Sequence, residues 1–334
     1  MFQVRKSEFV TIMLETVRRQ RRAAALAYPQ MTLAVPVVIE GTGLHSGKTI
    51  RMTLRPADAD HGIVFRRIDL EGSRDATDIR ARHDHVVETT MSTVIGNAAG
   101  ARVGTIEHLM AALSGLRIDN ALIEIDGAEV PVLDGSAEVF IERIEAAGMM
   151  ALDAPRRAIR ILKPVVVEDG AKRAALLPGD GFRLAFEIDF DNPVIGRQAI
   201  EADLYDPCFA DDILRARTFG FLKDQEALKA AGLGRGASLD NAIVIDGENI
   251  LNEEGLRYED EFVRHKVLDA VGDLSLSGLP LLGRYEGARS GHAMNNRVLR
   301  ALMADETAWE TVDFVEPSTA MYAAGRGLSV LTAD

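Results

Sequence analysis

Apolar and β-branched residues along this chain fall into short runs that are bounded by glycine, proline and aspartate. The runs lie at residues 36–41, 52–56, 62–65, 164–170, 175–178 and 182–186. Runs of this length with turn residues at both ends are typical of antiparallel strands and hairpins. The last three runs resemble the first three in order and in residue type, which indicates an internal repeat.

Helical periodicity appears at corresponding points of the two halves. The expected helices lie at residues 108–113 and 137–147 in the first half, and at 265–270 and 293–303 in the second. Strand runs followed by helices in each half predict an α+β fold. We therefore expect two similar domains, each a sheet layer packed against helices, with the active site in the crevice between them, where pockets are common.

The repeat sets the expected domain boundaries. Domain I spans residues 31–152 and domain II spans 158–310, with a link at about 153–157 around Pro155. Residues 1–30 form an N-terminal extension that is expected to be poorly ordered, and residues 311–334 form a C-terminal tail. The extension contains the basic run 18–22 followed by the alanine-rich run 23–27. That apolar stretch is too short for a signal peptide, so a basic helical extension or a weak membrane-surface contact remains.

Composition narrows the function classes. The chain has 334 residues, of which 47% are hydrophobic and 27% charged, and a net charge of -13. This charge argues against nonspecific binding of nucleic acid or anionic membrane, so a phosphate group would need a local basic cluster. Cys208 is the only cysteine, which excludes a disulfide within the chain and favours a reducing compartment. No run of about eighteen apolar residues is present, so no transmembrane helix is expected.

Two distant segments carry side chains suited to one metal ion. His265 and Asp269 stand at i and i+4, which on a helix places both on one face. Glu107 and His108 add a third ligand and a spare carboxylate. Two histidines and an aspartate are the ligand number of a catalytic zinc, which keeps an open position for water and needs a base for the water proton. The pattern therefore predicts a metallohydrolase.

A third segment supplies a candidate acid. His292 stands at the start of an expected helix after the small residues Ser290 and Gly291, and it could protonate a leaving amine. Asp273, one helical turn beyond Asp269, is placed to orient it. The turn that contains His45 lacks the Walker spacing and is interpreted as a hairpin turn, and His83 and His85 are a weak candidate for a ligand pair.

Seven blocks of the sequence, in order, resemble the UDP-3-O-acyl-N-acetylglucosamine deacetylases of lipid A synthesis. They are residues 43–48, 105–109, 134–137, 216–221, 239–242, 260–269 and 290–296, within a match that runs from about Val35 to Trp309. The resemblance implies zinc-dependent hydrolysis of the N-acetyl group of UDP-3-O-(3-hydroxyacyl)-N-acetylglucosamine, with release of acetate, as the committed step of lipid A biosynthesis.

The resemblance also implies a role for each catalytic residue. The zinc ligands are expected to be His108, His265 and Asp269. Glu107 would be the general base that activates water at the metal, and His292 would be the general acid for the departing nitrogen, oriented by Asp273. Thr218 would stabilise the oxyanion.

The substrate-binding residues are implied in the same way. Phe190 and Phe219 match positions that hold the uracil, and Lys266 and Arg289 fall near the nucleotide. Phe221 would lie by a hydrophobic passage for the acyl chain and Met91 near the mouth of the site; those six residues complete the expected set. Two positions depart from the family pattern. Arg289 replaces a common lysine, which changes the geometry but keeps the charge. Ser92 stands where many relatives have cysteine, which should affect a second, inhibitory zinc rather than the main chemistry.

The implied cofactor is one Zn²⁺, with ferrous iron possible in the cell, and the implied partner is the UDP-linked acylated amino sugar. A monomer in the cytoplasm of a Gram-negative type of bacterium is expected, without nucleic acid and without an integral membrane segment. Two rivals stay open from the ligands alone: a metallohydrolase of another amide, and a non-enzymatic module held by a structural zinc. The second would need four protein ligands, and only three are visible.

Overall fold

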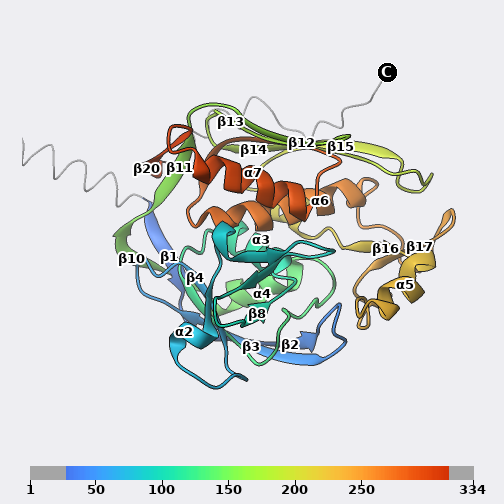
Figure 1. Ribbon diagram of the computed structural model, residues 1–334, viewed down its shortest axis with the longest axis horizontal. Coiled ribbons are helices and arrows are strands. Elements are labelled where there is room, and N and C mark those ends of the chain that lie inside the picture. Colours follow the sequence, from blue (N-terminus) through green and yellow to red (C-terminus); the bar gives the residue numbers. More distant parts are fainter. Residues whose placement is uncertain (1–27, 316–334) are drawn as a thin grey trace, which may run out of the picture.

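The computed structural model describes residues 28–315. Four layers are stacked in it: a sheet, a pair of helices, a second pair of helices and a second sheet (Figure 1). This arrangement confirms the predicted α+β class, because each sheet has helices packed on one of its faces. The two helix pairs meet in the middle of the molecule.

The first large sheet has five strands in the order β2-β3-β9-β4-β5. Their bounds are β2 Val37–Thr42, β3 Thr49–Pro56, β9 Ala121–Ile125, β4 Ile63–Arg67 and β5 Asp78–Arg80. β9 runs parallel to β4, and the other neighbours are antiparallel.

The second large sheet has seven strands, and β19 is its centre, since it pairs with β13, β14 and β11. The bounds are β11 Arg157–Ile161, β12 Val165–Asp169, β13 Lys172–Leu177, β14 Phe182–Asp189, β15 Arg197–Asp203, β19 Leu281–Ala288 and β20 Trp309–Asp313. β14 shows why such a run becomes a strand: Phe182, Leu184, Phe186 and Ile188 are buried and alternate with more exposed residues.

The predicted repeat is confirmed by topology. Within the second sheet the path β12-β13-β19-β14-β15 has the same order and the same strand directions as β2-β3-β9-β4-β5. Within each of these two five-strand paths, the third and fourth strands are parallel and all other neighbours are antiparallel. The predicted link at 153–157 falls on the end of β10 (Met149–Pro155) and the start of β11.

The helices follow the same plan. Their bounds are α2 Arg74–Thr77, α3 Glu107–Gly115, α4 Glu138–Ala147, α5 Gln225–Ala230, α6 Glu261–Leu274 and α7 His292–Ala304. α3 and α4 belong to the first half, while α6 and α7 pack on the second sheet. All four predicted helices are therefore confirmed, with ends that differ by a few residues. α6 is buried on nearly every side because it lies between α3 and the second sheet.

Three smaller sheets and several short turns complete the fold. The sheets are β1 Pro29–Leu33 with β10, β6 Val86–Glu88 with β7 Val94–Gly96 and β8 Arg102–Val103, and β16 Phe219–Phe221 with β17 Ile243–Asp246 and β18 Asn249–Ile250. The helical turns are η1 His83–His85, η2 Ala210–Leu214, η3 Leu222–Asp224 and η4 Ser275–Ser277. The β16–β18 sheet and α5 project from one side of the layered core (Figure 1).

Two sequence predictions concern the ends of the chain. Residues 1–27 of the basic N-terminal extension and residues 316–334 of the tail lie outside the described residues. Residues 311–313, which the sequence pattern places in the tail, instead form the end of β20 because they pair with β11. Between residues 28 and 315, none of the helices has the length and apolar character of a bilayer span.

A glycine sets the close approach of the two central helices. A Cβ atom on Gly272 of α6 would lie 2.0 Å from the backbone oxygen of Glu107 in α3. We expect Gly272→Ala to lower the free energy of unfolding by about 1–3 kcal/mol, because backbone cannot yield as a flexible side chain does. Urea unfolding measures the loss. Gly220→Ala is the control, since a methyl group there would have no heavy atom within 4 Å, and an equal loss in both variants would contradict the steric explanation.

Candidate metal centre

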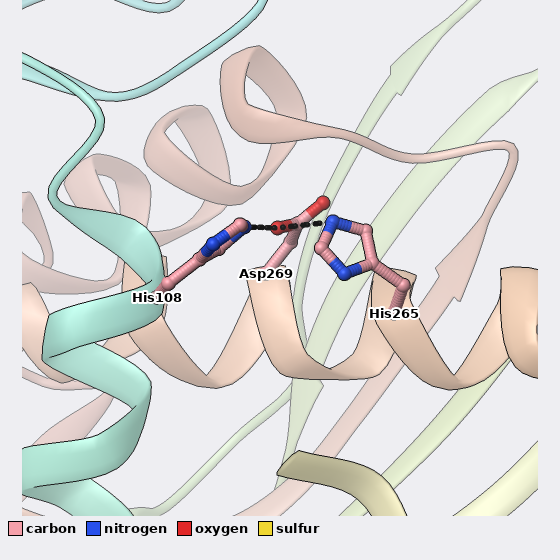
Figure 2. A group of neighbouring side chains, drawn as sticks. All are labelled: His108, His265 and Asp269. Carbon is pink, nitrogen blue, oxygen red and sulfur yellow. Dashed lines mark ion pairs between the residues drawn. The ribbon is translucent and has the colours of Figure 1, made fainter. Parts of the chain in front are cut away.

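His108 and the pair His265 and Asp269 converge from two helices. His108 lies in the first turn of α3, and the other two lie one turn apart on α6 (Figure 2). Their donor atoms lie within 4.8 Å of one another, and all three residues are buried. The predicted ligands therefore come together, one from the first half of the chain and two from the second.

The contacts within this group fit a metal ion. His265 Nδ1 lies 3.1 Å from the backbone oxygen of Ala216, so it carries the proton and Nε2 presents a lone pair. That Nε2 lies 3.3 Å from Asp269 Oδ1, and His108 Nε2 lies 3.6 Å from the same oxygen. Buried acceptors that face one another are costly unless a cation lies between them. Two imidazoles and a carboxylate are also a donor set typical of catalytic zinc.

Electrostatics keep these ligands in the protonation state that a metal needs. Burial lowers the pKa of His265 to about 3, so its imidazole is neutral at physiological pH. Burial opposes the charged form of Asp269, but the positive charge of Lys266 holds the pKa of its carboxyl well below the ordinary value. Lys266 Nζ is 2.7 Å from Asp269 Oδ2, so the carboxylate has one oxygen on the lysine and the other facing the histidines.

The candidate base and acid lie beside this group. Glu107 Oε1 is 4.0 Å from His292 Nε2, which is longer than a hydrogen bond. The other oxygen of Glu107 accepts a hydrogen bond of 3.0 Å from the backbone nitrogen of Thr93. Burial raises the pKa of Glu107, while His292 and His108 act in the opposite direction. Both groups therefore lie within reach of one small molecule.

Asp273 of α6 contacts His292 directly. Its Oδ2 is 2.9 Å from His292 Nδ1 and also accepts a hydrogen bond of 2.9 Å from Asn295 Nδ2. Its Oδ1 accepts a hydrogen bond of 2.5 Å from Thr93 Oγ1. Burial opposes the charged imidazolium, but the charge and hydrogen bond of Asp273 override it and raise the pKa of His292 to about 10. His292 therefore stays protonated at neutral pH.

Thr93 is a site residue that the sequence analysis missed. It connects the base and the acid, because its backbone nitrogen holds Glu107 and its hydroxyl holds the aspartate behind His292. Asn295 was quoted only as part of a motif, yet it is fully buried, and its Oδ1 accepts a hydrogen bond of 2.6 Å from Tyr285. No local pattern marks these roles, since each contact joins distant parts of the chain.

His45 was interpreted as a hairpin-turn residue, and the turn is confirmed by the backbone hydrogen bond from Gly43 to Lys48. Its electrostatic link to the site could not be predicted from the sequence. The pKa of His45 is lowered, mainly by burial. The charge of Glu129 opposes this shift, and the charge of His292 adds to it. Glu129 fixes this turn, because its carboxylate accepts hydrogen bonds from the backbone nitrogens of His45 and Ser46, at 2.7 and 2.9 Å.

A buried ion pair holds the loop that contains Thr218. Arg217 is 4% exposed and contacts Glu261, which is fully buried at the start of α6, at 2.9 Å. The backbone oxygen of the neighbouring Ala216 accepts a hydrogen bond from His265, and Thr218 donates its backbone nitrogen to Gly135 at 2.8 Å. The backbone of Thr218 is therefore fixed by Gly135. Thr218 lies two residues after Ala216, which accepts the hydrogen bond from the metal ligand His265.

The predicted aromatic residues cluster next to the metal group. The Phe219 ring centroid is 6.2 Å from that of His265 and 5.7 Å from that of Phe190, and Phe221 lies 6.3 Å from Phe190. Lys266 Nζ lies 5.6 Å from the centroid of the Phe219 ring. An aromatic cluster with a cation over one of its rings is thus available beside the ligands.

Met91 and Arg289, the two remaining predicted substrate residues, are both exposed. Met91 is 54% exposed and stands two residues before Thr93, and its φ of 63° is in the left-handed region. Arg289 is exposed and forms an ion pair with Asp189, next to Phe190 in the chain, rather than with a metal-site residue. Ser92, the chain neighbour of Met91, is buried. His83 and His85, the weak ligand candidate, lie in η1 and are not part of the group.

Comparisons with known proteins show the family of this chain. The family model described as LpxC: UDP-3-O-acyl N-acetylglycosamine deacetylase matches residues 30–304. Curated relatives named UDP-3-O-acyl-N-acetylglucosamine deacetylase include proteins of Phenylobacterium zucineum (51% identical over 86% of this chain and 97% of the relative), Teredinibacter turnerae (51%, over 87% and 95%) and Pseudomonas entomophila (50%, over 87% and 95%). The chain belongs to the LpxC family of UDP-3-O-acyl N-acetylglycosamine deacetylases.

Proposed function

We propose that this protein removes the N-acetyl group of UDP-3-O-(3-hydroxyacyl)-N-acetylglucosamine, a lipid A precursor, and releases acetate. The convergence of His108, His265 and Asp269 beside Glu107 and His292 is the observation that carries the proposal. The shared name of relatives that are about half identical over most of the chain supports the substrate. A structural zinc is disfavoured because a fourth protein ligand is missing from the group found in the described residues.

We further propose that the metal is zinc, with ferrous iron as the alternative in the cell. A divalent ion bound by these three side chains supplies a Lewis acid that polarises an amide carbonyl and acidifies water. His108, His265 and Asp269 would hold it. The chain acts as a monomer in the cytoplasm in this proposal, because one chain supplies the ligands, the base and the acid, and because its single cysteine and nucleotide-linked substrate suit that compartment.

Proton transfer is the task of two residues. Glu107 is the base that takes a proton from the attacking water, and its second oxygen is held by Thr93. His292 is the acid that gives a proton to the glucosamine nitrogen as the C–N bond breaks, and Asp273 orients it. The 4.0 Å gap between Glu107 and His292 leaves both free to act on the substrate. Thr218 would donate a hydrogen bond to the oxyanion that forms.

Substrate recognition is assigned to the region around the aromatic cluster. Phe190 and Phe219 would pack against the uracil, and Lys266 and Arg289 would contact the nucleotide side of the substrate. Phe221 would line the acyl passage, and Met91 would lie at the mouth. The short distances among the three phenylalanines and the position of Lys266 over Phe219 support these assignments.

Acetate release tests the function directly. The metal-loaded full chain should hydrolyse UDP-3-O-(3-hydroxyacyl)-N-acetylglucosamine, and kcat/KM should fall at least about 100-fold for UDP-N-acetylglucosamine, because each buried methylene contributes roughly 0.8 kcal/mol. An N-acetylated peptide should release no acetate. Equal kcat/KM with and without the acyl chain would rule out an acyl passage, and turnover of the peptide alone would favour the rival metallohydrolase.

The role of Asp273 predicts a change in pH dependence. Asp273→Asn removes the charge that raises the pKa of His292 to about 10, so burial should lower this pKa by roughly 1–3 pH units. A general acid is lost as pH rises through its pKa. The alkaline limb of the kcat/KM profile should therefore move to lower pH, and the variant should lose more activity at pH 9 than at pH 6.

The control for this profile is Asp169→Asn. Asp169 is an exposed carboxylate that pairs with Arg297 of α7 at 3.1 Å, so its loss changes the charge near the same helix without touching His292. Its profile should match that of the unmodified protein. A parallel loss of activity at all pH values in Asp273→Asn would mean that Asp273 acts only through structure.

A further inference from the structure

A cavity of about 380 Å³ lies at the C-terminal ends of the same two central helices. Leu113 and Ser114 line it from the C-terminal end of α3, and Leu274 and Ser275 line it from the C-terminal end of α6. Trp309 of β20 forms part of another wall. None of the proposed metal ligands or catalytic residues lines this cavity, and its volume is within the range of small-molecule sites.

Slightly more than half of the lining surface is apolar, and several of the polar groups inside are already paired. Asp119 is bonded to Arg156 at 2.8 Å, Asn120 donates to Gln30 at 2.9 Å, and Ser275 donates to the backbone oxygen of Gly272 at 2.7 Å. A sugar or a nucleotide base would find few free partners here. The interior is therefore suited to an apolar chain.

One polar atom at the cavity lacks a partner. The indole Nε1 of Trp309 is buried and forms no hydrogen bond with any described residue. An indole N–H is a donor only, and leaving it buried without an acceptor costs free energy. This nitrogen has almost no accessible surface, so it is closed to a ligand in the cavity and takes no part in the binding proposed below.

The edge of the cavity carries three exposed arginines, Arg80, Arg82 and Arg157, which we call the arginine rim. Arg80 has no ion-pair partner among residues 28–315, and Arg82 and Arg157 contact Asp84 and Asp60 at the long distances of 3.4 and 3.6 Å. The net charge of the chain is -13, so the arginine rim has the opposite sign to the chain as a whole. Weakly paired guanidinium groups are suited to carboxylate or phosphate.

The two helix ends fix the orientation of a ligand. The C-terminal ends of α3 and α6 carry partial negative charge toward the cavity floor, which disfavours an anionic group there. A negative head group is favoured at the arginine rim instead, and the apolar part is favoured against Leu113 and Leu274. We propose that this cavity binds an amphipathic anion, an aliphatic chain with one carboxylate or phosphate head group, at a site separate from the catalytic one.

Trp309 allows a direct test, because it is the only tryptophan of the chain. Bromine quenches indole fluorescence on contact, so 11-bromoundecanoate, below its micelle concentration, should quench Trp309 of the metal-loaded full chain with a saturable dependence. A chain bound at the metal centre would not contact this residue. Unlabelled dodecanoate and dodecyl phosphate should each reverse the quenching, and the more effective one identifies the head group.

Substitutions test the contribution of the arginine rim and the need for an open cavity. The double variant Arg80→Gln/Arg157→Gln should bind 11-bromoundecanoate roughly 10-fold more weakly than the unmodified protein does, as expected for two exposed charge contacts. The uncharged 11-bromoundecanol should bind the unmodified protein more weakly than the acid by a similar factor. Arg160→Gln is the matched control, since Arg160 is an exposed arginine of β11 paired with Glu310 and is not in the lining. Ser114→Phe should fill the cavity and abolish saturable quenching.

Three outcomes would overturn the proposal. They are quenching that rises linearly without saturation, equal affinity for the bromo-acid and the bromo-alcohol, and unchanged affinity in the arginine double variant. If Ser114→Phe fails to fold, as judged by circular dichroism, the arginine variants still decide, because their side chains are exposed and their loss does not disturb the core.

Discussion

His265→Ala is expected to yield a folded protein that contains no tightly bound metal and has no measurable turnover. His265 supplies one of three converging donors, and its neutral imidazole is fixed by Ala216. Loss of a hydrogen-bond partner behind a ligand typically costs 10–100-fold in metal affinity, so loss of a ligand itself should cost more than about 100-fold. Metal content after gel filtration, measured by elemental analysis, checks the result together with kcat.

His108→Ala distinguishes the effect of a lost metal ligand from the effect of a disturbed loop at residues 216–218. Its Nδ1 has no hydrogen-bond partner in the described part of the chain, so this variant removes a ligand without the loss of a hydrogen bond to 216–218. Equal metal loss in both variants would assign the effect to coordination. His85→Ala, which removes a histidine paired with Asp84 outside the group, should retain full metal content. A stoichiometric metal in His265→Ala would refute the ligand assignment.

The parts of the fold that could be predicted from the sequence are those that depend on local periodicity. Alternation of apolar residues identified the strands around β14, and the i, i+4 spacing placed His265 and Asp269 on one face of α6. The repeat could be predicted because both halves use the same order of strand runs and helices. The glycine at 272 carried no such signal, since only the packing of α3 on α6 shows why a side chain is excluded there.

The supporting contacts of the site could not be predicted, because they join distant residues. Thr93 bonds to Asp273 across 180 positions of sequence, and the threonine itself is an ordinary strand-type residue. Arg217 and Glu261 look like two surface charges in a sequence, yet both are buried and determine where Thr218 lies. His45 belongs to a recognisable turn, but its electrostatic link to His292 depends on how that turn is placed by Glu129.

Glu107→Gln should keep the metal and lose turnover. Glutamine has nearly the same shape, and its amide oxygen can accept the hydrogen bond that Thr93 donates to Glu107. It cannot take a proton from water at neutral pH. General base catalysis contributes about 10²–10⁴-fold, so kcat should fall by roughly 10³-fold while KM changes little. Steady-state kinetics and metal content on the same preparation measure both effects.

The comparison with His292→Gln makes this prediction specific to a base–acid pair. Both groups act in one turnover, so the double variant should be only slightly slower than either single variant instead of showing the product of the two losses. Glu124→Gln, which removes a carboxylate paired with Arg55 on the first sheet, should keep the original kcat. If Glu107→Gln retains kcat within about tenfold, proton transfer does not pass through this carboxylate, and another residue near the metal must act as the base.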